Sequence, residues 1–171
     1  MDAASQDERY LSAAAEFGSA LERLAHACEA DATERRDLLQ DIHLALWRSL
    51  AVFDGRCSMR TWVYRVAHNT AAPHVTARRR RPKGVSIEEF EFADDGASPE
   101  QAAGENQALE RLMAMIRALK PPDAQVMLLY LEDLDAAAIG EITGLSARAI
   151  ATKVHRIKAL LARRFEGGRD G

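Results

Sequence analysis

Aromatic, basic and amide side chains that suit contact with unpaired nucleic acid are concentrated between residues 61 and 81. They are Trp62, Tyr64, Arg65 and Asn69, followed by Arg78, Arg79, Arg80 and Arg81. Aromatic rings stack on exposed bases, and arginines neutralise phosphates. Only 6% of the residues are aromatic, and five of them, Trp47, Phe53, Trp62, Tyr64 and Tyr130, lie in a few elements, which indicates a nucleic-acid surface.

A second candidate surface lies near the end of the chain. Residues 136–142 and 147–161 both have apolar residues at helical spacing, and the short segment between them contains a glycine. This pattern is typical of a helix-turn-helix, with Ser146 as the cap of its second helix. The outer face of that helix presents Arg148, Thr152, His155 and Arg156. These side chains suit base edges and phosphates, although many such motifs serve only packing, so both interpretations stay open.

The elements that must position these residues are helices. Apolar residues at spacings of three and four predict a helix over residues 9–30, and another from about Thr33, which we expect to cap it. Asp54-Gly55 is a turn signal. The next helix is predicted from about Ser58 through the arginines, with a kink or break near Ala72, because Pro73 costs ~3 kcal/mol in a helix interior.

The charges are segregated along the chain, although the formal net charge is only −3. Between residues 85 and 107 there are seven acidic residues and no Lys or Arg, whereas residues 141–164 hold six basic residues and one acid. Proline and glycine recur through residues 82–104 and indicate a linker, whose ~23 residues reach ~75 Å when extended. We therefore expect an all-α protein of two small helical domains, 5–83 and 108–166, joined by an acidic flexible linker, 84–107.

Composition and motifs argue against several other classes. The N-terminal segment lacks the apolar run of a signal peptide, and the longest apolar run, residues 126–131, is too short for a bilayer. We therefore expect a soluble, cytoplasmic protein with reduced cysteines. The five histidines and two cysteines show no metal-binding spacing, and there is no phosphate loop or nucleophile motif. We expect no enzyme activity, no catalytic residue, no metal and no cofactor.

Several segments in order and spacing carry a resemblance to a known family. They are DLLQD with LWRSL, then FDGRC and RTWVYRVAHNT, then LKPP, and finally EITGLS with HRIKALLARR. Together the two halves resemble the extracytoplasmic-function subfamily of bacterial sigma factors, over nearly the whole chain. The resemblance implies a promoter-melting domain followed by a helix-turn-helix domain. It also implies three partners: core RNA polymerase, through its β′ clamp helices and β flap; promoter DNA; and an anti-sigma factor.

The resemblance assigns a docking role to the polar face of the second helix. In the family, this face contacts the coiled-coil clamp helices of the polymerase β′ subunit. The matching residues are Asp37, Gln40, Asp41 and Arg48. Without the resemblance, a solvated helix face explains the same side chains, so that alternative stays open.

The resemblance also implies two sets of DNA contacts. The loop at residues 51–59 corresponds to the loop that captures a flipped base of the −10 element, and the next helix to the one that holds the melted strand. The matching residues are Phe53, Asp54, Gly55, Arg60, Trp62, Arg65 and Asn69, with phosphate contacts from Arg78, Arg79, Arg80, Arg81 and Lys83. For the −35 element they are Arg148, Thr152, Lys153, His155 and Arg156. For Trp62, a core anchor is the alternative.

The sequence departs from the family pattern at His43, at Pro73, at residues 136–138, and at Ala151 and Lys153, where basic residues, commonly Lys and Arg, are usual. His43 stands where a Phe is usual in the polymerase-facing helix, and we interpret it as a local repacking. Pro73 stands where the family keeps a residue compatible with continuous helix. Residues 136–138 are three alanines in place of a more polar, acidic start of the helix-turn-helix.

One alternative function and two further hypotheses remain. A conventional helix-turn-helix regulator explains the second half equally well, but not the segments at residues 37–41 and 62–70. Cys57 lies in the predicted base-capture loop, where a thiol is either a small packed residue or an oxidisable gate. The acidic linker is also able to screen the basic surfaces and so disfavour DNA binding by the isolated protein.

Overall fold

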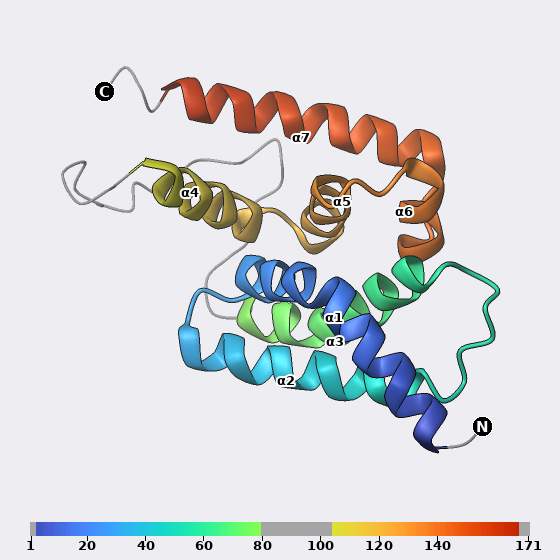
Figure 1. Cartoon of the computed structure of the whole chain (residues 1–171). Helices are drawn as coiled ribbons and strands as arrows, with labels where there is room; N and C mark the ends of the chain where they lie inside the picture. Colours follow the sequence, from blue (N-terminus) through green and yellow to red (C-terminus); the bar gives the residue numbers. More distant parts are fainter. Residues whose placement is uncertain (1–2, 80–103, 168–171) are drawn as a thin grey trace.

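The computed structural model describes residues 3–79 and 104–167, and every regular element in these ranges is an α-helix. The first group of helices is α1 (Ala3–Cys28), α2 (Ala32–Ser49) and α3 (Met59–Arg79). The second is α4 (Gly104–Ala118), α5 (Pro121–Leu131), α6 (Ala136–Thr143) and α7 (Ala147–Gly167). Figure 1 shows α1–α3 together on one side of the molecule and α4–α7 on the other. The expected all-α class is therefore confirmed.

The first three helices enclose one core because each carries a continuous apolar stripe. The stripes are Phe17, Leu21 and Leu24 from α1, Leu38, Ile42 and Leu46 from α2, and Val63, Ala67 and Ala71 from α3, all buried. The alanines of α3 allow the other two helices to approach its backbone closely. We refer to α1–α3 as the first unit.

The second unit, α4–α7, is built around the helix-turn-helix of α6 and α7. Gly144 ends α6 in the left-handed conformation, with φ 78°, which glycine adopts without the steric cost that other residues meet. A Cβ on Gly140 would lie 2.9 Å from the carbonyl oxygen of Leu145, so the tight turn needs a glycine there too. The Ser146 hydroxyl accepts a hydrogen bond from the amide of Ala149 at 3.1 Å, which confirms the predicted cap.

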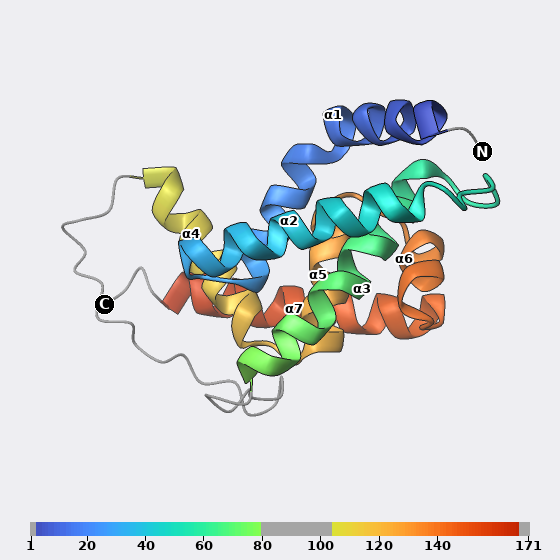
Figure 2. The same ribbon diagram turned by 90° about the horizontal axis from the view of Figure 1, so that it is seen from below.

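The two units share apolar cores. Met113 and Ile116 of α4 and Leu128 of α5 are buried in the cluster formed by α1–α3. In return, Ala20 of α1 and Tyr64 of α3 are buried among residues of α5, α6 and α7. Figure 2 shows α5 and α6 beside α3 from below. Most of the predicted acidic linker, residues 84–107, lies outside the described residues.

The start of α2 differs from the sequence prediction. Thr33 is not the cap of α2; the cap is Asp31, whose carboxylate accepts hydrogen bonds from the amides of Thr33 and Glu34, each at 2.9 Å. An ionised carboxylate is a better acceptor at a helix N-terminus than a hydroxyl. The two prolines at 121 and 122 follow the end of α4 and form the first turn of α5. Their missing amide hydrogens cost nothing in the first turn.

We predicted a kink or break near Ala72; the break does not occur, because α3 is continuous with Pro73 inside it, and the kink stays a prediction. The proline leaves the carbonyl of Asn69 without its usual amide partner. Asn69 and Pro73 are both exposed, so water is able to hydrate that carbonyl. The buried face, with Ala67 and Ala71, lies on the other side of the helix and keeps its packing.

Candidate nucleic-acid interface

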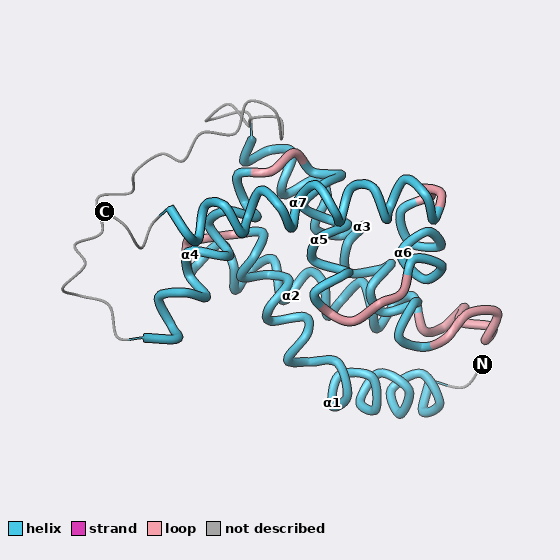
Figure 3. Tube along the Cα trace, turned by 90° about the horizontal axis from the view of Figure 1, so that it is seen from above, coloured by secondary structure: helices cyan, strands magenta, loops and turns pink. Residues whose placement is uncertain are grey.

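The loop between α2 and α3 projects beyond the helices at one end of the molecule (Figure 3). Gly55 takes the left-handed conformation, with φ 77°, and the Asp54 carboxylate accepts the amide of Arg56 at 3.1 Å and pairs with its guanidinium at 2.9 Å. Val52 in the same loop is 72% exposed. The turn is therefore held by local contacts while its outer side chains face solvent.

Trp62 anchors this loop to the first unit. Its ring lies edge-on to Phe53, with centroids 5.2 Å apart, and its indole N–H donates to the Ser49 hydroxyl at 3.0 Å. Both rings are half-buried and pack against the core of α1–α3. This environment favours the core-anchor alternative for much of the Trp62 ring.

Of the other side chains on α3, Arg60 and Asn69 are exposed, and Arg60 and Arg65 donate to the second unit. The guanidinium of Arg65 donates to the backbone oxygen of Glu141 in α6 at 3.2 Å, and that of Arg60 donates to the backbone oxygen of Glu132, directly after α5. The side chains of Arg78 and Arg79, and all of Arg80, Arg81 and Lys83, lie outside the described residues.

The face of α2 predicted to dock on polymerase is open. Asp37, Gln40, Asp41 and Arg48 are all exposed. Two large apolar side chains lie among them, Leu44 at 45% and Trp47 at 37% exposure. The resemblance assigns no role to these two side chains, although the spacing Gln40, Leu44, Arg48 already indicates a shared helix face.

His43 fills a gap between α1 and α2. Its Nδ1 lies 3.0 Å from the hydroxyl of Tyr10, and the two rings meet edge-on with centroids 6.0 Å apart. Burial lowers the pKa of this imidazole. The contact agrees with the predicted local repacking around His43. The comparison with the Phe that is usual at this position in the family stays a prediction.

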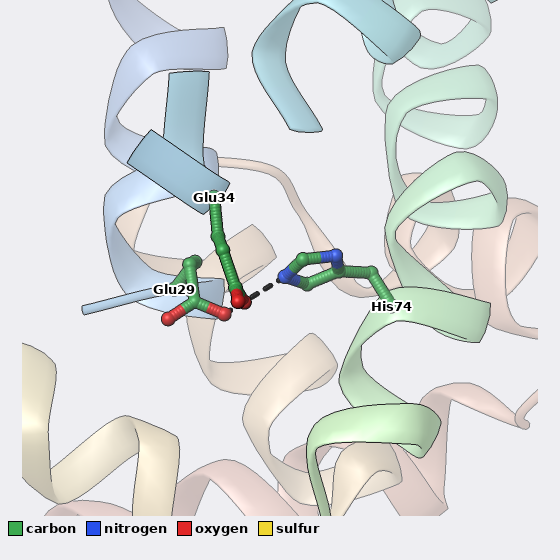
Figure 4. Close-up of side chains that lie close together, drawn as sticks. All are labelled: Glu29, Glu34 and His74. Carbon is green, nitrogen blue, oxygen red and sulfur yellow. Dashed lines mark hydrogen bonds and ion pairs between the residues drawn. The ribbon is translucent and has the colours of Figure 1, made fainter. Parts of the chain in front are cut away.

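A small ionic cluster lies where the end of α1 meets α3 (Figure 4). His74 Nε2 is 2.9 Å from a carboxylate oxygen of the buried Glu29, and Glu34 points toward them. The ligand atoms of these three residues lie within 4.8 Å of one another, a spacing compatible with a metal ion. The direct contact between His74 and Glu29, however, gives the pair a structural purpose of its own, which is to hold α3 against the α1–α2 connection.

The recognition face of α7 is solvent-accessible, with one exception. Arg148, Thr152, His155 and Arg156 are exposed. Lys153 is half-buried instead, and its ammonium group pairs with the carboxylate of Asp123 in α5 at 2.7 Å. Asp123 is only 7% exposed. The sequence analysis missed this pair, because no local signal connects residues on two separate helices.

Comparison with known proteins agrees with this architecture. Residues 14–81 match the model of Sigma-70 region 2, and residues 109–161 match that of Sigma-70, region 4. Over 130 residues the chain is 34% identical to the RNA polymerase sigma-H factor of Pseudomonas aeruginosa, covering 71% of this chain and 62% of that protein. Over 127 residues it is 30% identical to the ECF RNA polymerase sigma-E factor of Escherichia coli, covering 71% of this chain and 66% of the relative.

The chain belongs to the extracytoplasmic-function subfamily of the sigma-70 family. The region 2 match falls on α1–α3 and the region 4 match on α4–α7. The chain aligns with less than two thirds of the length of each of these curated relatives. The solved structure of CnrH in complex with the cytosolic domain of CnrY has the same fold, with a TM-score of 0.67 at 19% identity over 96% of this chain and 95% of that one.

Within the described residues, no helix has the length and apolarity needed to cross a bilayer. Cys57 is a free, partly exposed thiol in the loop before α3, so both interpretations of it remain predictions.

Proposed function

We propose that this protein is a sigma factor that binds core RNA polymerase and directs promoter-specific initiation of transcription. The observation that carries the proposal is the order of the two matched regions, region 2 on α1–α3 and region 4 on the helix-turn-helix unit. A conventional regulator needs no region 2. In this role the protein works in the cytoplasm and recruits an enzyme without having catalytic residues of its own.

The first unit supplies polymerase docking. The exposed face of α2 presents Asp37, Asp41 and Arg48 beside the apolar surface of Leu44 and Trp47. Interfaces combine a buried apolar centre with a polar rim, and this face has both. We assign this face of α2, together with Gln40, to contact with the clamp helices of β′. We assign part of the second unit to contact with the β flap.

The loop and α3 supply recognition of the −10 element. Base capture needs a loop that offers backbone groups and an open turn, and the turn at Asp54-Gly55 is stabilised by local hydrogen bonds. Phe53 and Trp62 hold the loop in place. Arg60, Arg65 and Asn69 then contact the melted strand, and the arginines at 78–81 its phosphates.

The second unit reads the −35 element in the major groove. Arg148, Thr152, His155 and Arg156 are exposed on α7, and a well-placed bidentate Arg–guanine pair contributes about 1–3 kcal/mol of discrimination. Lys153 contributes by orienting α7 through Asp123, with any DNA contact secondary. We also propose control by an anti-sigma factor; CnrH, which has the same fold, is solved in complex with the cytosolic domain of a second protein.

Reconstituted transcription tests the proposal. Purified full chain is mixed with core polymerase on a library of double-stranded promoters, and the transcripts are sequenced. We expect transcripts that require both proteins and share two sequence elements. Tight binding to a palindromic duplex without polymerase, and no core-dependent transcript, would overturn the proposal.

A matched pair of variants tests the docking face. Asp41→Arg reverses an exposed charge on α2, whereas Glu16→Arg makes the same change on the exposed face of α1. We expect Asp41→Arg to weaken core binding in a pull-down by about tenfold, since like charges placed across an interface are costly. Glu16→Arg should bind as the wild type does. Equal binding by both variants would contradict the assignment of this face.

A further inference from the structure

Three side chains with metal-binding atoms meet where the end of α1, the start of α2 and the last turns of α3 come together (Figure 4). Glu29 directly follows α1, Glu34 lies in the first turn of α2, and His74 lies on α3. One ligand atom of each residue lies within 4.8 Å of the other two. Two carboxylates and one imidazole are therefore available to a single ion.

The spacing of these atoms fits a tetrahedral ion. Zinc binds imidazole nitrogen and carboxylate oxygen at about 2.0–2.2 Å, so two ligand atoms of a tetrahedral site lie about 3.4 Å apart. His74 Nε2 and a carboxylate oxygen of Glu29 are 2.9 Å apart, so a small movement is enough to admit an ion between them. The Glu34 side chain is exposed and is able to adjust its position by rotating about its own bonds.

Glu29 is already held in the orientation that a ligand needs. Its side chain is 7% exposed, and its Oε1 accepts the amide of Asp31 at 3.0 Å. A hydrogen bond to the second atom of a ligand group is typical of metal sites, because it fixes the first atom toward the ion. The other oxygen, Oε2, faces Nε2 of His74.

Glu34 points toward this cluster, although its position in α2 offers it another role. Asp31 caps α2 and Glu34 is the third residue of that helix, which is the spacing of a capping box, where the glutamate accepts the amide of the cap residue. Here that amide donates to Glu29 instead. Within the described residues the Glu34 carboxylate has no hydrogen bond or ion pair, and a second carboxylate lies close to it. A cation relieves the repulsion between two such groups.

We propose that Glu29, Glu34 and His74 form a zinc site, with water as the fourth ligand. Imidazole is a good ligand for zinc, whereas magnesium prefers oxygen ligands alone. Binding requires Nε2 of His74 to lose its proton, so the ion replaces the hydrogen bond between His74 and Glu29. The spacing of residues along the chain did not predict a metal, because positions 29, 34 and 74 meet only in the fold. The site does not depend on the proposed function.

Isothermal titration calorimetry of the untagged full chain with zinc chloride, after removal of metals with EDTA, tests the site. We expect one zinc ion per chain. Glu34→Gln should weaken binding by at least about tenfold, an effect that even residues supporting a ligand reach. Glu16→Gln makes the same change on the exposed face of α1 and should bind zinc as the wild type does. No zinc binding by the wild type, or equal binding by Glu34→Gln, would overturn the site.

X-ray absorption at the zinc edge identifies the ligands in the wild type. We expect nitrogen and oxygen neighbours at about 2.0–2.2 Å, including one imidazole that is lost in His74→Asn. A sulfur neighbour at about 2.3 Å would place the ion at a cysteine and overturn the proposal. A titration with magnesium chloride gives a further check: affinity equal to that for zinc, and unchanged in His74→Asn, would overturn the role of the imidazole.

Thermal unfolding measures the effect of the ion on the first unit. Zinc at a hundredfold excess over its dissociation constant should raise the unfolding midpoint of the wild type and of Glu16→Gln by about 5–10 °C. Glu34→Gln should gain at most about half as much at the same zinc concentration. Circular dichroism without zinc checks that all variants have equal helix content. A rise of the same size in Glu34→Gln would show that the ion binds elsewhere.

Discussion

The two helices predicted to contact DNA, α3 and α7, use similar residues in different ways. On α7, four of the five predicted side chains are exposed, and the fifth, Lys153, pairs with Asp123. On α3, the described arginines at 60 and 65 already donate to the second unit, and Trp62 donates to Ser49. A basic or aromatic residue on a helix therefore acquires its role from what the fold places opposite it.

The largest expected effect separates Lys153 from its exposed neighbours on α7. Lys153→Ala leaves the carboxylate of Asp123 buried without its cation, which costs about 3 kcal/mol in the free energy of unfolding. Arg156→Ala, at an exposed position, should change that free energy by less than about 0.5 kcal/mol. Urea unfolding followed by circular dichroism measures both. Equal stabilities would mean that Lys153 is a surface residue like Arg156.

A pH effect of similar size should arise from α3. Burial lowers the pKa of His68 to about 4, below its ordinary value of about 6.5. The unfolded chain therefore binds a proton that the folded chain does not, so stability is full above pH 6.5 and falls as the pH drops toward 4, by about 3 kcal/mol. His68→Asn should lose this part of the fall in urea unfolding across that range. A variant with the wild-type pH dependence would contradict the prediction.

An intermediate effect should appear in DNA binding by α7. Removing the exposed guanidinium of Arg148 in Arg148→Ala should weaken −35 recognition by about 2 kcal/mol, or roughly thirtyfold, while the stability stays unchanged. Fluorescence anisotropy with the holoenzyme and a selected promoter measures the affinity. An unchanged affinity would remove Arg148 from the recognition surface.

The smallest expected effect concerns Arg65. Its hydrogen bond to the Glu141 backbone oxygen is exposed and 3.2 Å long, so Arg65→Ala should lower the free energy of unfolding by about 1 kcal/mol or less. Promoter melting, measured by permanganate reactivity of thymines, should fall more strongly than stability. Normal melting in this variant would show that Arg65 serves only the contact between the units.

Most of the helices could be predicted because their signals are local. The apolar spacing of α2 and α7 and the glycine between α6 and α7 are readable from neighbouring residues. The two wrong predictions, at Thr33 and Pro73, concern positions where neighbouring residues give competing local signals. Thr33 is not the cap of α2 because Asp31, two residues earlier, offers a charged acceptor. Pro73 is tolerated inside α3 because it lies on the exposed side of the helix.

The candidate sites were only partly predictable. The exposed polar residues of α2 and α7 lie where helical periodicity indicates. Leu44 and Trp47, which lie among those of α2, were missed because large apolar residues are usually assigned to a core. Phosphate contacts by the arginines at 78–81 stay a prediction, since their side chains lie outside the described residues.

The helices, the apolar stripes that form each core and the helix-turn-helix follow from local sequence signals, because periodicity and capping act within a few residues. Which charged groups remain available to a partner depends instead on how the helices pack. The residues that engage Lys153, Arg60 and Arg65 lie 30, 72 and 76 positions away along the chain. No local pattern specifies such pairs, because they form only when the packing of α3 against α5 and α6, and of α5 against α7, brings those positions together.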